Sequence, residues 1–308
     1  PISSFHIADP DIDNATSINE ALATGKHIVF TPGIYELDET LTVTKPNTVI
    51  LGLGLPTLIP QNGVVAVKTD DIPGVVLAGF MVDAGPVLSP TLLQIGSEDS
   101  IITFPDNPIS LHDIYCRVGG AVVGTAETAL TINSNYVIGD HFWLWRADHG
   151  VGTEWMGGQN KHGLVVNGDH VTIYGLFNEH FQSYQTLWRG EYGRTYFYQS
   201  EIPYHPPSLE LWNDNGKPGW ASYKVVDDVQ HHEAYGLGIY SFFSGESTVS
   251  NHVRLKNAME VPDNLGIVVK HISTFAGLNG GIDHPINGLG PVTKAGELNL
   301  YTGFKGRQ

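Results

Sequence analysis

The sequence predicts an all-β chain that folds as a right-handed parallel β-helix with one short N-terminal helix, in a single domain over residues 1–308. Three observations point to this fold: a turn-rich composition, short β-branched runs, and a coil-like pattern that recurs along the chain. Glycine accounts for 36 of 308 residues, and charged residues are 16% of the chain, against about 25% in an average protein. Many short strands joined by turns would give this composition.

The N-terminal region carries the clearest helical signal. Ser17-Ile-Asn-Glu20 has the form of a capping box, with Ser17 as the N-cap and Glu20 in the first turn. The helix is expected over residues 18–23, ending at Gly25. Helical periodicity is almost absent after residue 25, so the rest of the chain is expected to be strands and turns.

Strand signals then continue along the chain. Short β-branched runs bounded by Gly, Pro, Asn or Asp favour strands, and they occur at residues 27–30, 34–37, 48–51, 64–67 and 75–78. A longer pattern recurs with variable insertions: a turn residue, an apolar triplet, a polar or Gly break, and a second apolar pair. It is found at residues 74–83, 135–144, 170–177 and 265–272. Such recurrence indicates a solenoid, in which each coil buries its side chains by stacking on its neighbours.

A β-sandwich or barrel is the competing all-β fold. It would use hairpins, and Asn-Gly is a strong hairpin signal. The five Asn-Gly pairs of this chain are not flanked by clean apolar–polar alternation, so we do not expect hairpins there; they lie at residues 62–63, 167–168, 215–216, 279–280 and 287–288.

Charge and motifs exclude several classes of partner. The formal net charge is −16 and Lys and Arg are not clustered, which argues against nucleic acid and anionic membranes. No apolar run approaches the ~18 residues of a membrane helix. His231-His232-Glu233 lacks the spacing of a zinc-binding helix, and Gly52-Leu-Gly54 lacks the third glycine of a dinucleotide motif. We therefore expect no metal and no cofactor.

Two glutamates stand out within this framework. Glu179 and Glu201 end two consecutive strand-like runs and lie 22 positions apart, close to one solenoid coil. If the chain makes one turn between them, both carboxylates face the same side of neighbouring coils, about 5 Å apart along the axis. Paired carboxylates of this kind cleave glycosidic bonds, and the spacing alone fits either an inverting or a retaining pair. The structural alternative is a solvated carboxylate or a partner for Arg189 or Arg194.

The surroundings of the two glutamates differ in sequence. Glu201 lies between Tyr198 and Ile202-Pro203-Tyr204, an apolar setting that should raise its pKa and keep it protonated. Glu179 is flanked by Asn178 and His180, a more polar setting that should leave it ionised.

Aromatic and polar residues near the pair are candidates for sugar contacts. Trp188 is the first choice for a stacking platform, and with Tyr204 it is expected to flank the groove. The other substrate-binding candidates are Tyr198, Gln199, Trp145, Asp148 and His149.

At these residues the sequence resembles glycoside hydrolase family 55, the β-1,3-glucanases. The similar runs are Asn178-Glu-His180, Leu187-Trp-Arg-Gly190, Gly193-Arg-Thr-Tyr-Phe-Tyr-Gln-Ser-Glu-Ile-Pro-Tyr204, Trp220-Ala-Ser-Tyr-Lys-Val225 and His232-Glu-Ala-Tyr-Gly-Leu-Gly238. The resemblance implies a pectate-lyase-like β-helix and an inverting, mostly exo-acting enzyme. It also implies that Glu201 is the general acid and that Glu179 positions or activates the hydrolytic water. His205 stands where the family is expected to carry Asp, which puts one sugar subsite in doubt.

Family members carry two tandem β-helices, and the resemblance places this chain as the second, C-terminal one. The first helix lines part of the pocket, so a second polypeptide is a possible partner besides the β-glucan itself. The chain opens at Pro1 without an initiator Met, and we expect a secreted, extracellular protein from which a leader or longer region has been removed.

Two other functions are compatible with the predicted fold. A non-catalytic carbohydrate-binding β-helix would need only the aromatic loops. A polysaccharide lyase would need basic residues or Asp-bound calcium facing an acidic sugar, and 16 Lys and Arg in all argue against it.

Overall fold

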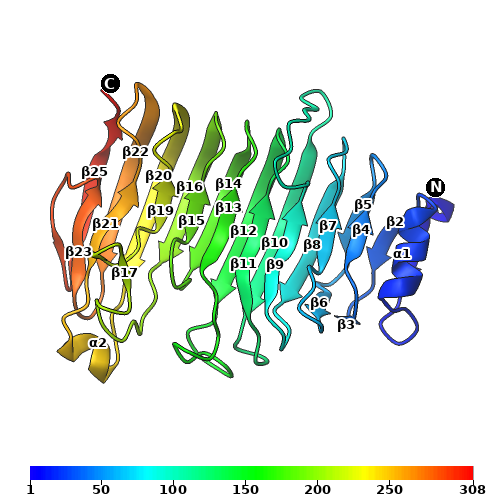
Figure 1. The fold of residues 1–308 in the computed structure, drawn as a ribbon, viewed down its shortest axis with the longest axis horizontal. Coiled ribbons are helices and arrows are strands. Elements are labelled where there is room, and N and C mark those ends of the chain that lie inside the picture. The colour runs from blue at the N-terminus through cyan, green and yellow to red at the C-terminus, as the bar shows by residue number, and fades with distance from the viewer. Residues whose placement is uncertain (308) are drawn as a thin grey trace.

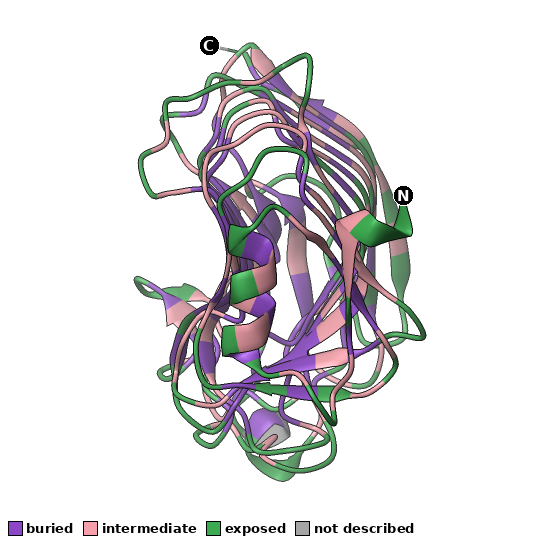
Figure 2. Ribbon diagram, turned by 90° about the vertical axis from the view of Figure 1, so that its right-hand side faces the viewer, coloured by how far each residue is buried: buried purple, intermediate pink, exposed green. Residues whose placement is uncertain are grey.

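The chain forms a stack of parallel coils in the computed structural model, which describes residues 1–307 (Figure 1). Two large sheets run the length of the stack and almost all neighbouring strands pair in parallel. Figure 2 looks along the stack, and the successive coils overlie one another. The predicted parallel β-helix is confirmed.

The first large sheet, sheet A, has 13 strands. They are β1 (Phe5–Ala8), β2 (His27–Phe30), β3 (Ile34–Leu37), β5 (Val49–Gly52), β6 (Thr57–Pro60), β8 (Val76–Asp83), β10 (Ile109–Val118), β12 (Val137–Arg146), β14 (Thr172–Glu179), β16 (Gly193–Glu201), β20 (His231–Ser241), β22 (Gly266–Ala276) and β25 (Leu298–Lys305).

The second large sheet, sheet B, has 10 shorter strands. They are β4 (Leu41–Val43), β7 (Val67–Thr69), β9 (Ser89–Ile95), β11 (Ala126–Ile132), β13 (His162–Val166), β15 (Thr186–Trp188), β19 (Tyr223–Val225), β21 (Leu255–Glu260), β23 (Gly281–Ile286) and β24 (Thr293–Lys294). Each coil therefore crosses sheet A, turns, and returns through sheet B.

The long strands of sheet A bend at one residue each. That residue has a left-handed backbone conformation and is skipped in the strand pairing. The aligned positions are Gly79, Asp113, His141, Gly175, Phe197, Gly236 and His271. Because the bends stack in register, the residues four positions after them, which include Glu179 and Glu201, form one row across the sheet.

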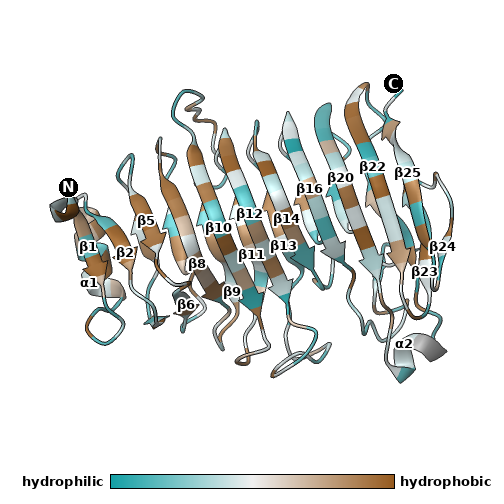
Figure 3. Cartoon of the chain, turned by 180° about the vertical axis from the view of Figure 1, so that it is seen from behind, coloured by the Kyte–Doolittle hydropathy of each residue, from teal (hydrophilic) through white to brown (hydrophobic). Residues whose placement is uncertain are grey.

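The interior of the stack is filled with Ile, Leu, Val and aromatic side chains. In sheet A buried and more exposed positions alternate along most strands, as in β12 with its pattern of alternating burial. Figure 3 shows this alternation as brown and teal bands. A side chain on the outer face of one strand therefore lies beside the outer-face side chains of the neighbouring coils.

The N-terminal helix differs in detail from the prediction. Helix α1 (Ala15–Ala23) begins three residues earlier than expected, and its N-cap is Asn14. Asn14 Oδ1 accepts from the Ser17 backbone N–H at 2.9 Å, and Ser17 Oγ accepts from the Asn14 backbone N–H at 3.2 Å. Ser17 is thus the third helical residue of a capping box and not its N-cap, because Asn is at least as good a cap as Ser.

Two further expectations were wrong. The structure has a second α-helix, α2 (Glu246–Ser250), in a long connection near the C-terminal end of the stack. It also has a 3₁₀ turn, η1 (Ile2–Ser4), at the N-terminus. Asn215-Gly216 does turn a hairpin, between β17 (Asn213–Asp214) and β18 (Lys217–Pro218). Both turn residues have positive φ, 49° and 87°, as a two-residue hairpin requires, so the dipeptide outweighed the missing alternation.

Candidate active site

The two glutamates lie on adjacent strands, as the coil spacing predicts. β14 pairs with β16 in parallel, with Phe177 opposite Gln199, and the next outward positions are Glu179 and Glu201. Trp145 pairs with Glu179 on one side, and Tyr240 pairs with Glu201 on the other. The site is therefore a row across four coils, with an aromatic residue at each end and two carboxylates between them.

Glu179 is the more deeply buried of the pair. Only 8% of its surface is exposed, and Trp143 Nε1 donates a hydrogen bond to Glu179 Oε2 at 2.8 Å. Burial raises the pKa of Glu179 to about 7; the Trp143 hydrogen bond opposes this shift and the negative charge of Glu201 adds to it. The expectation of a wet setting for Glu179 was wrong, because Trp143 from the neighbouring coil covers the carboxylate.

Glu201 keeps contact with solvent, with 28% of its side chain exposed. The Tyr204 hydroxyl donates to Glu201 Oε2, and Gln199 Nε2 lies 3.5 Å from Oε1. Burial raises the pKa of Tyr204, and its hydrogen bond to Glu201 raises it further, so the phenol stays protonated as a donor. Tyr204 and Gln199, both predicted site residues, therefore orient the Glu201 carboxylate.

A histidine and an aspartate complete the polar part of the site. His180 Nε2 lies 3.9 Å from both Glu201 Oε2 and Asp148 Oδ1. Burial lowers the pKa of His180 to about 4, although the charge of Asp148 opposes the shift, so the ring is neutral at pH 7. Asp148 Oδ1 also lies 3.0 Å from His149 Nδ1. The structure thus brings Asp148 close to the pair, with the exposed His149 beside it.

Two predicted sugar-binding residues lie elsewhere. Trp188 is fully buried inside the solenoid, where its ring packs against Tyr223 and His232. Tyr198 is buried as well, and its hydroxyl lies 2.8 Å from Ser222 Oγ. Neither side chain can touch a sugar on the outer face. Both predictions were wrong, because the side chains point into the stack.

Two residues at the site were not predicted, Trp143 and His180. Trp143 is 44% exposed, and its indole lies 6.0 Å from that of Trp145. A signal for it was present, since residues two apart on a strand share a face and Trp145 was already a candidate. His205, the departure from the family pattern, is exposed and lies 3.1 Å from Ser244 Oγ through Nε2.

Cavities lie on the outer face on both sides of the pair. One of about 340 Å³ is lined by Trp143, Trp145 and Tyr115. The other, of about 490 Å³, is lined by Gln199, Tyr240 and neighbours from β22 and β25. Rings beside a pair of carboxylates suit a sugar, whose apolar faces stack while its hydroxyls bond to polar groups. The arrangement can bind a neutral polymer across the strands and place a bond at the carboxylates.

The part of the chain that the structure describes offers no cluster of His, Cys, Asp and Glu able to hold a metal ion. No helix within residues 1–307 is long and apolar enough to cross a membrane.

Comparisons with known proteins show which family the chain is similar to. The profile of the LAM55 pectate lyase-like domain matches residues 5–201. An exo-beta-1,3-glucanase from Streptomyces sp. (strain SirexAA-E / ActE) is 41% identical over 294 residues, which are 95% of this chain and 48% of that protein. The chain thus spans about half the length of this relative.

Solved structures give the same result. The structure of sacteLam55A from Streptomyces sp. SirexAA-E matches with a TM-score of 0.95 and 40% identity, over 99% of this chain and 55% of that one. A variant of sacteLam55A in complex with glucose matches with a TM-score of 0.95 and 39% identity, over the same shares. On these matches the chain belongs to the LAM55 pectate lyase-like domains of glycoside hydrolase family 55.

Proposed function

We propose that this chain hydrolyses β-1,3-glucan of the laminarin type by an inverting, mostly exo-acting mechanism. The observation that carries the proposal is the glutamate pair, Glu179 and Glu201, between the aromatic residues Trp145 and Tyr240. The relative named exo-beta-1,3-glucanase, 41% identical to this chain, supports the choice of substrate.

Glu201 is the general acid in this proposal. An acid must touch the glycosidic oxygen, and Glu201 is the member of the pair that keeps 28% of its side chain exposed. It also lies in the string Gln-Ser-Glu-Ile-Pro, whose glutamate matches the general acid in the family resemblance. Proton transfer to a leaving oxygen contributes roughly 10²–10⁴ in rate.

Glu179 is the general base, acting on water from the Trp143 side. Its pKa, raised to about 7, lies near neutral pH, where a base is most effective because it is both available and strong. The two carboxyls interact, so their protons belong to the pair. An inverting hydrolysis requires the base carboxyl of such a pair to be ionised when it activates water.

The opposite wall of the pocket is assigned to a further β-helix. The chain covers 55% of sacteLam55A, which leaves room in such a protein for a second domain of similar size. We propose that this chain works as the C-terminal helix of that arrangement, with the other helix in the same or a separate polypeptide. We also propose that the protein acts outside the cell, where polymeric glucan is accessible.

The experiment compares Glu201→Gln with the unaltered protein on two substrates, in the assembly that holds both helices. Hydrolysis of laminarin should fall by roughly 10²–10⁴, because the amide keeps the shape of the side chain but has no proton to give. An aryl β-glucoside with an acidic phenol as leaving group should be affected much less. Substrate binding, measured by calorimetry, should persist.

Glu179→Gln is the matched variant. It should lose activity on both substrates, and azide should restore turnover because it needs no base. If Glu179→Gln and not Glu201→Gln shows the dependence on leaving group, the two roles are exchanged. If Glu201→Gln hydrolyses laminarin at the original rate, the chain is a carbohydrate-binding domain, for which the aromatic row alone suffices.

A further inference from the structure

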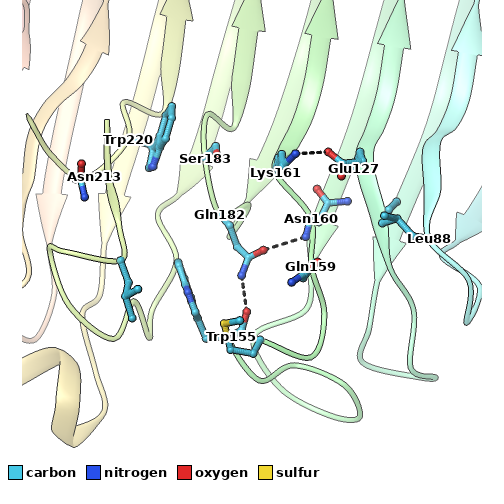
Figure 4. Close-up of a pocket in the computed structure, with 13 residues that line it drawn as sticks. Leu88, Glu127, Trp155, Gln159, Asn160, Lys161, Gln182, Ser183, Asn213 and Trp220 are labelled. Atoms are coloured by element: carbon cyan, nitrogen blue, oxygen red, sulfur yellow. Dashed lines mark hydrogen bonds and ion pairs between the residues drawn. The ribbon is translucent and has the colours of Figure 1, made fainter. Parts of the chain in front are cut away.

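A cavity of about 330 Å³ lies beyond the 180–185 connection from the glutamate pair. Neither Glu179 nor Glu201 lines it. The connection starts at His180, beside Glu201, and its later residues Gln182 and Ser183 reach the cavity wall (Figure 4). We name this the amide cavity, because Gln159, Asn160, Gln182 and Asn213 line it.

The polar groups of the amide cavity suit a neutral ligand rich in hydroxyls. Carboxamides donate and accept hydrogen bonds, as does the hydroxyl of Ser183. Two of the four amides also hold the wall together: Gln182 accepts from the Asn160 backbone N–H, and Asn213 accepts from the Gly216 backbone N–H. The two charged residues of the wall, Lys161 and Glu127, pair with each other at 2.6 Å (Figure 4). Their charges cancel, so the cavity does not select an anion or a cation.

Two indoles give the cavity its apolar surfaces. The guanidinium carbon of Arg146 lies 5.8 Å from the ring centre of Trp155, and the backbone oxygen of Trp155 accepts from Gln182 Nε2. Trp220 packs edge-on against Tyr184 with ring centres 4.9 Å apart. Both indoles are held before a ligand arrives, which lowers the entropic cost of stacking on them.

Asn160 supplies a second, independent observation. The residue lines the cavity, yet only 1% of its surface is exposed. Within residues 1–307 neither its side-chain oxygen nor its side-chain nitrogen has a hydrogen-bond partner. Figure 4 places it on the wall between Gln182 and Glu127. Buried amides are nearly always bonded, so an orphaned amide points to a group that is supplied from outside the chain.

We infer that the amide cavity is a non-catalytic carbohydrate-binding site, which holds a short stretch of a neutral glucan chain away from the glutamate pair. Amides for hydroxyls, indoles for sugar faces and a wall without net charge together define this ligand class. The choice of β-1,3-glucan among neutral glycans rests on the proposed function. Binding here would keep the domain on a polymer between cleavage events.

The test titrates the full chain carrying Glu201→Gln with laminarihexaose and follows the six indole N–H signals by NMR. We expect the Trp155 and Trp220 signals to shift, and to shift equally in Trp145→Ala, which damages the aromatic row at the glutamate pair. Trp155→Ala should weaken the affinity read from the Trp220 signal about tenfold. Tyr192→Ala, which removes an exposed ring at the other edge of the coils, should leave this affinity unchanged.

Asn160→Ala is a second test variant, used because Trp155→Ala could lose affinity simply by failing to fold. The Asn160 amide has no partner within the described chain, so its removal should leave Tm unchanged while weakening affinity at the Trp220 signal. A lowered Tm with unchanged affinity would overturn the inference. A titration in which the Trp143 and Trp145 signals move and those of Trp155 and Trp220 do not would also overturn the inference. That result would leave the proposed function standing, because the sugar would then bind at the glutamate pair. If no indole signal moves, the inference fails, and the laminarin assay of the two-helix assembly decides the proposed function separately.

Discussion

The two edges of the coil stack are built differently. From β11 to β20, the turns that lead from sheet B into sheet A are short, at residues 133–136, 167–171, 189–192 and 226–230. The connections that lead back into sheet B are longer and irregular, and they include residues 147–161 and 202–222. The glutamate pair, His180 and the amide cavity all lie toward the irregular edge.

The short-turn edge carries a ladder of rings. Tyr136, His170, Tyr192 and His231 stack on one another at centre distances of 4.5, 4.7 and 4.5 Å with nearly parallel planes. Coils that repeat the same turn bring the same side chain to the same place, so the ladder follows from the repetition itself. At the other edge the connections differ from coil to coil, so different side chains can lie next to one another there. One edge therefore serves coil stacking, and the other holds the candidate active site.

The largest expected effect at the irregular edge is on catalysis. If Glu179 is the base, it must be ionised, so kcat/KM on laminarin should fall as pH drops through about 7, the pKa to which burial raises this carboxyl. Glu179→Gln should remove this acid limb and lower the rate by roughly 10²–10⁴. The pH profile of the complete assembly is the measurement. A limb that persists in Glu179→Gln belongs to another group.

The interior between the edges should give the largest effect on stability. Trp188→Ala should lower the free energy of unfolding by about 3–5 kcal/mol, since it leaves a cavity where a large buried ring was packed. Urea denaturation measures this change. Trp143→Ala is the control: its indole is 44% exposed, so it should cost activity and little stability. Equal losses of stability from both variants would contradict the buried position of Trp188.

Glu179 also links the site to stability. Its folded-state pKa is raised from 4.5 to about 7, so the folded protein holds this proton more tightly than the unfolded chain. The resulting contribution is fully present below about pH 4.5 and is lost as pH rises through about 7. Glu179→Gln should therefore be more stable than the original chain by about 3 kcal/mol at pH 8, and nearly equal at pH 4. Thermal unfolding at the two pH values checks this, and a variant that is less stable at pH 8 would contradict it.

The smallest expected effect lies in the ring ladder. Tyr192→Ala removes two stacking contacts, to His170 and His231, and should cost about 1 kcal/mol of stability. Activity should not change, because the ladder lies at the edge away from the glutamates. Chemical denaturation and a laminarin assay together test the division between the edges, and a clear loss of activity would break it.

Sequence reasoning found what the coil period determines and missed what depends on side-chain direction. The 22-residue spacing of Glu179 and Glu201 was enough to place them on neighbouring strands. Trp188 was placed on the wrong side because β15 is short and buried at all three positions, which leaves no alternation to show where a side chain points. The solvated setting predicted for Glu179 was wrong, because the residue that covers its carboxylate, Trp143, is 36 residues away in sequence. Only the stacking of coils brings the two together.

The direction of the last strand, β25, limits how coils can be added to the C-terminal end of the stack. β25 pairs with β22 in antiparallel fashion, whereas the strands before it in sheet A pair in parallel. A further coil of the same kind would need a parallel neighbour at the position that β25 occupies, so extra repeats cannot be appended to this end of the stack. Lengthening a gene for this fold downstream of β25 would therefore produce a separate body with its own core, and duplication of the whole unit is an easier evolutionary route than extension by single coils.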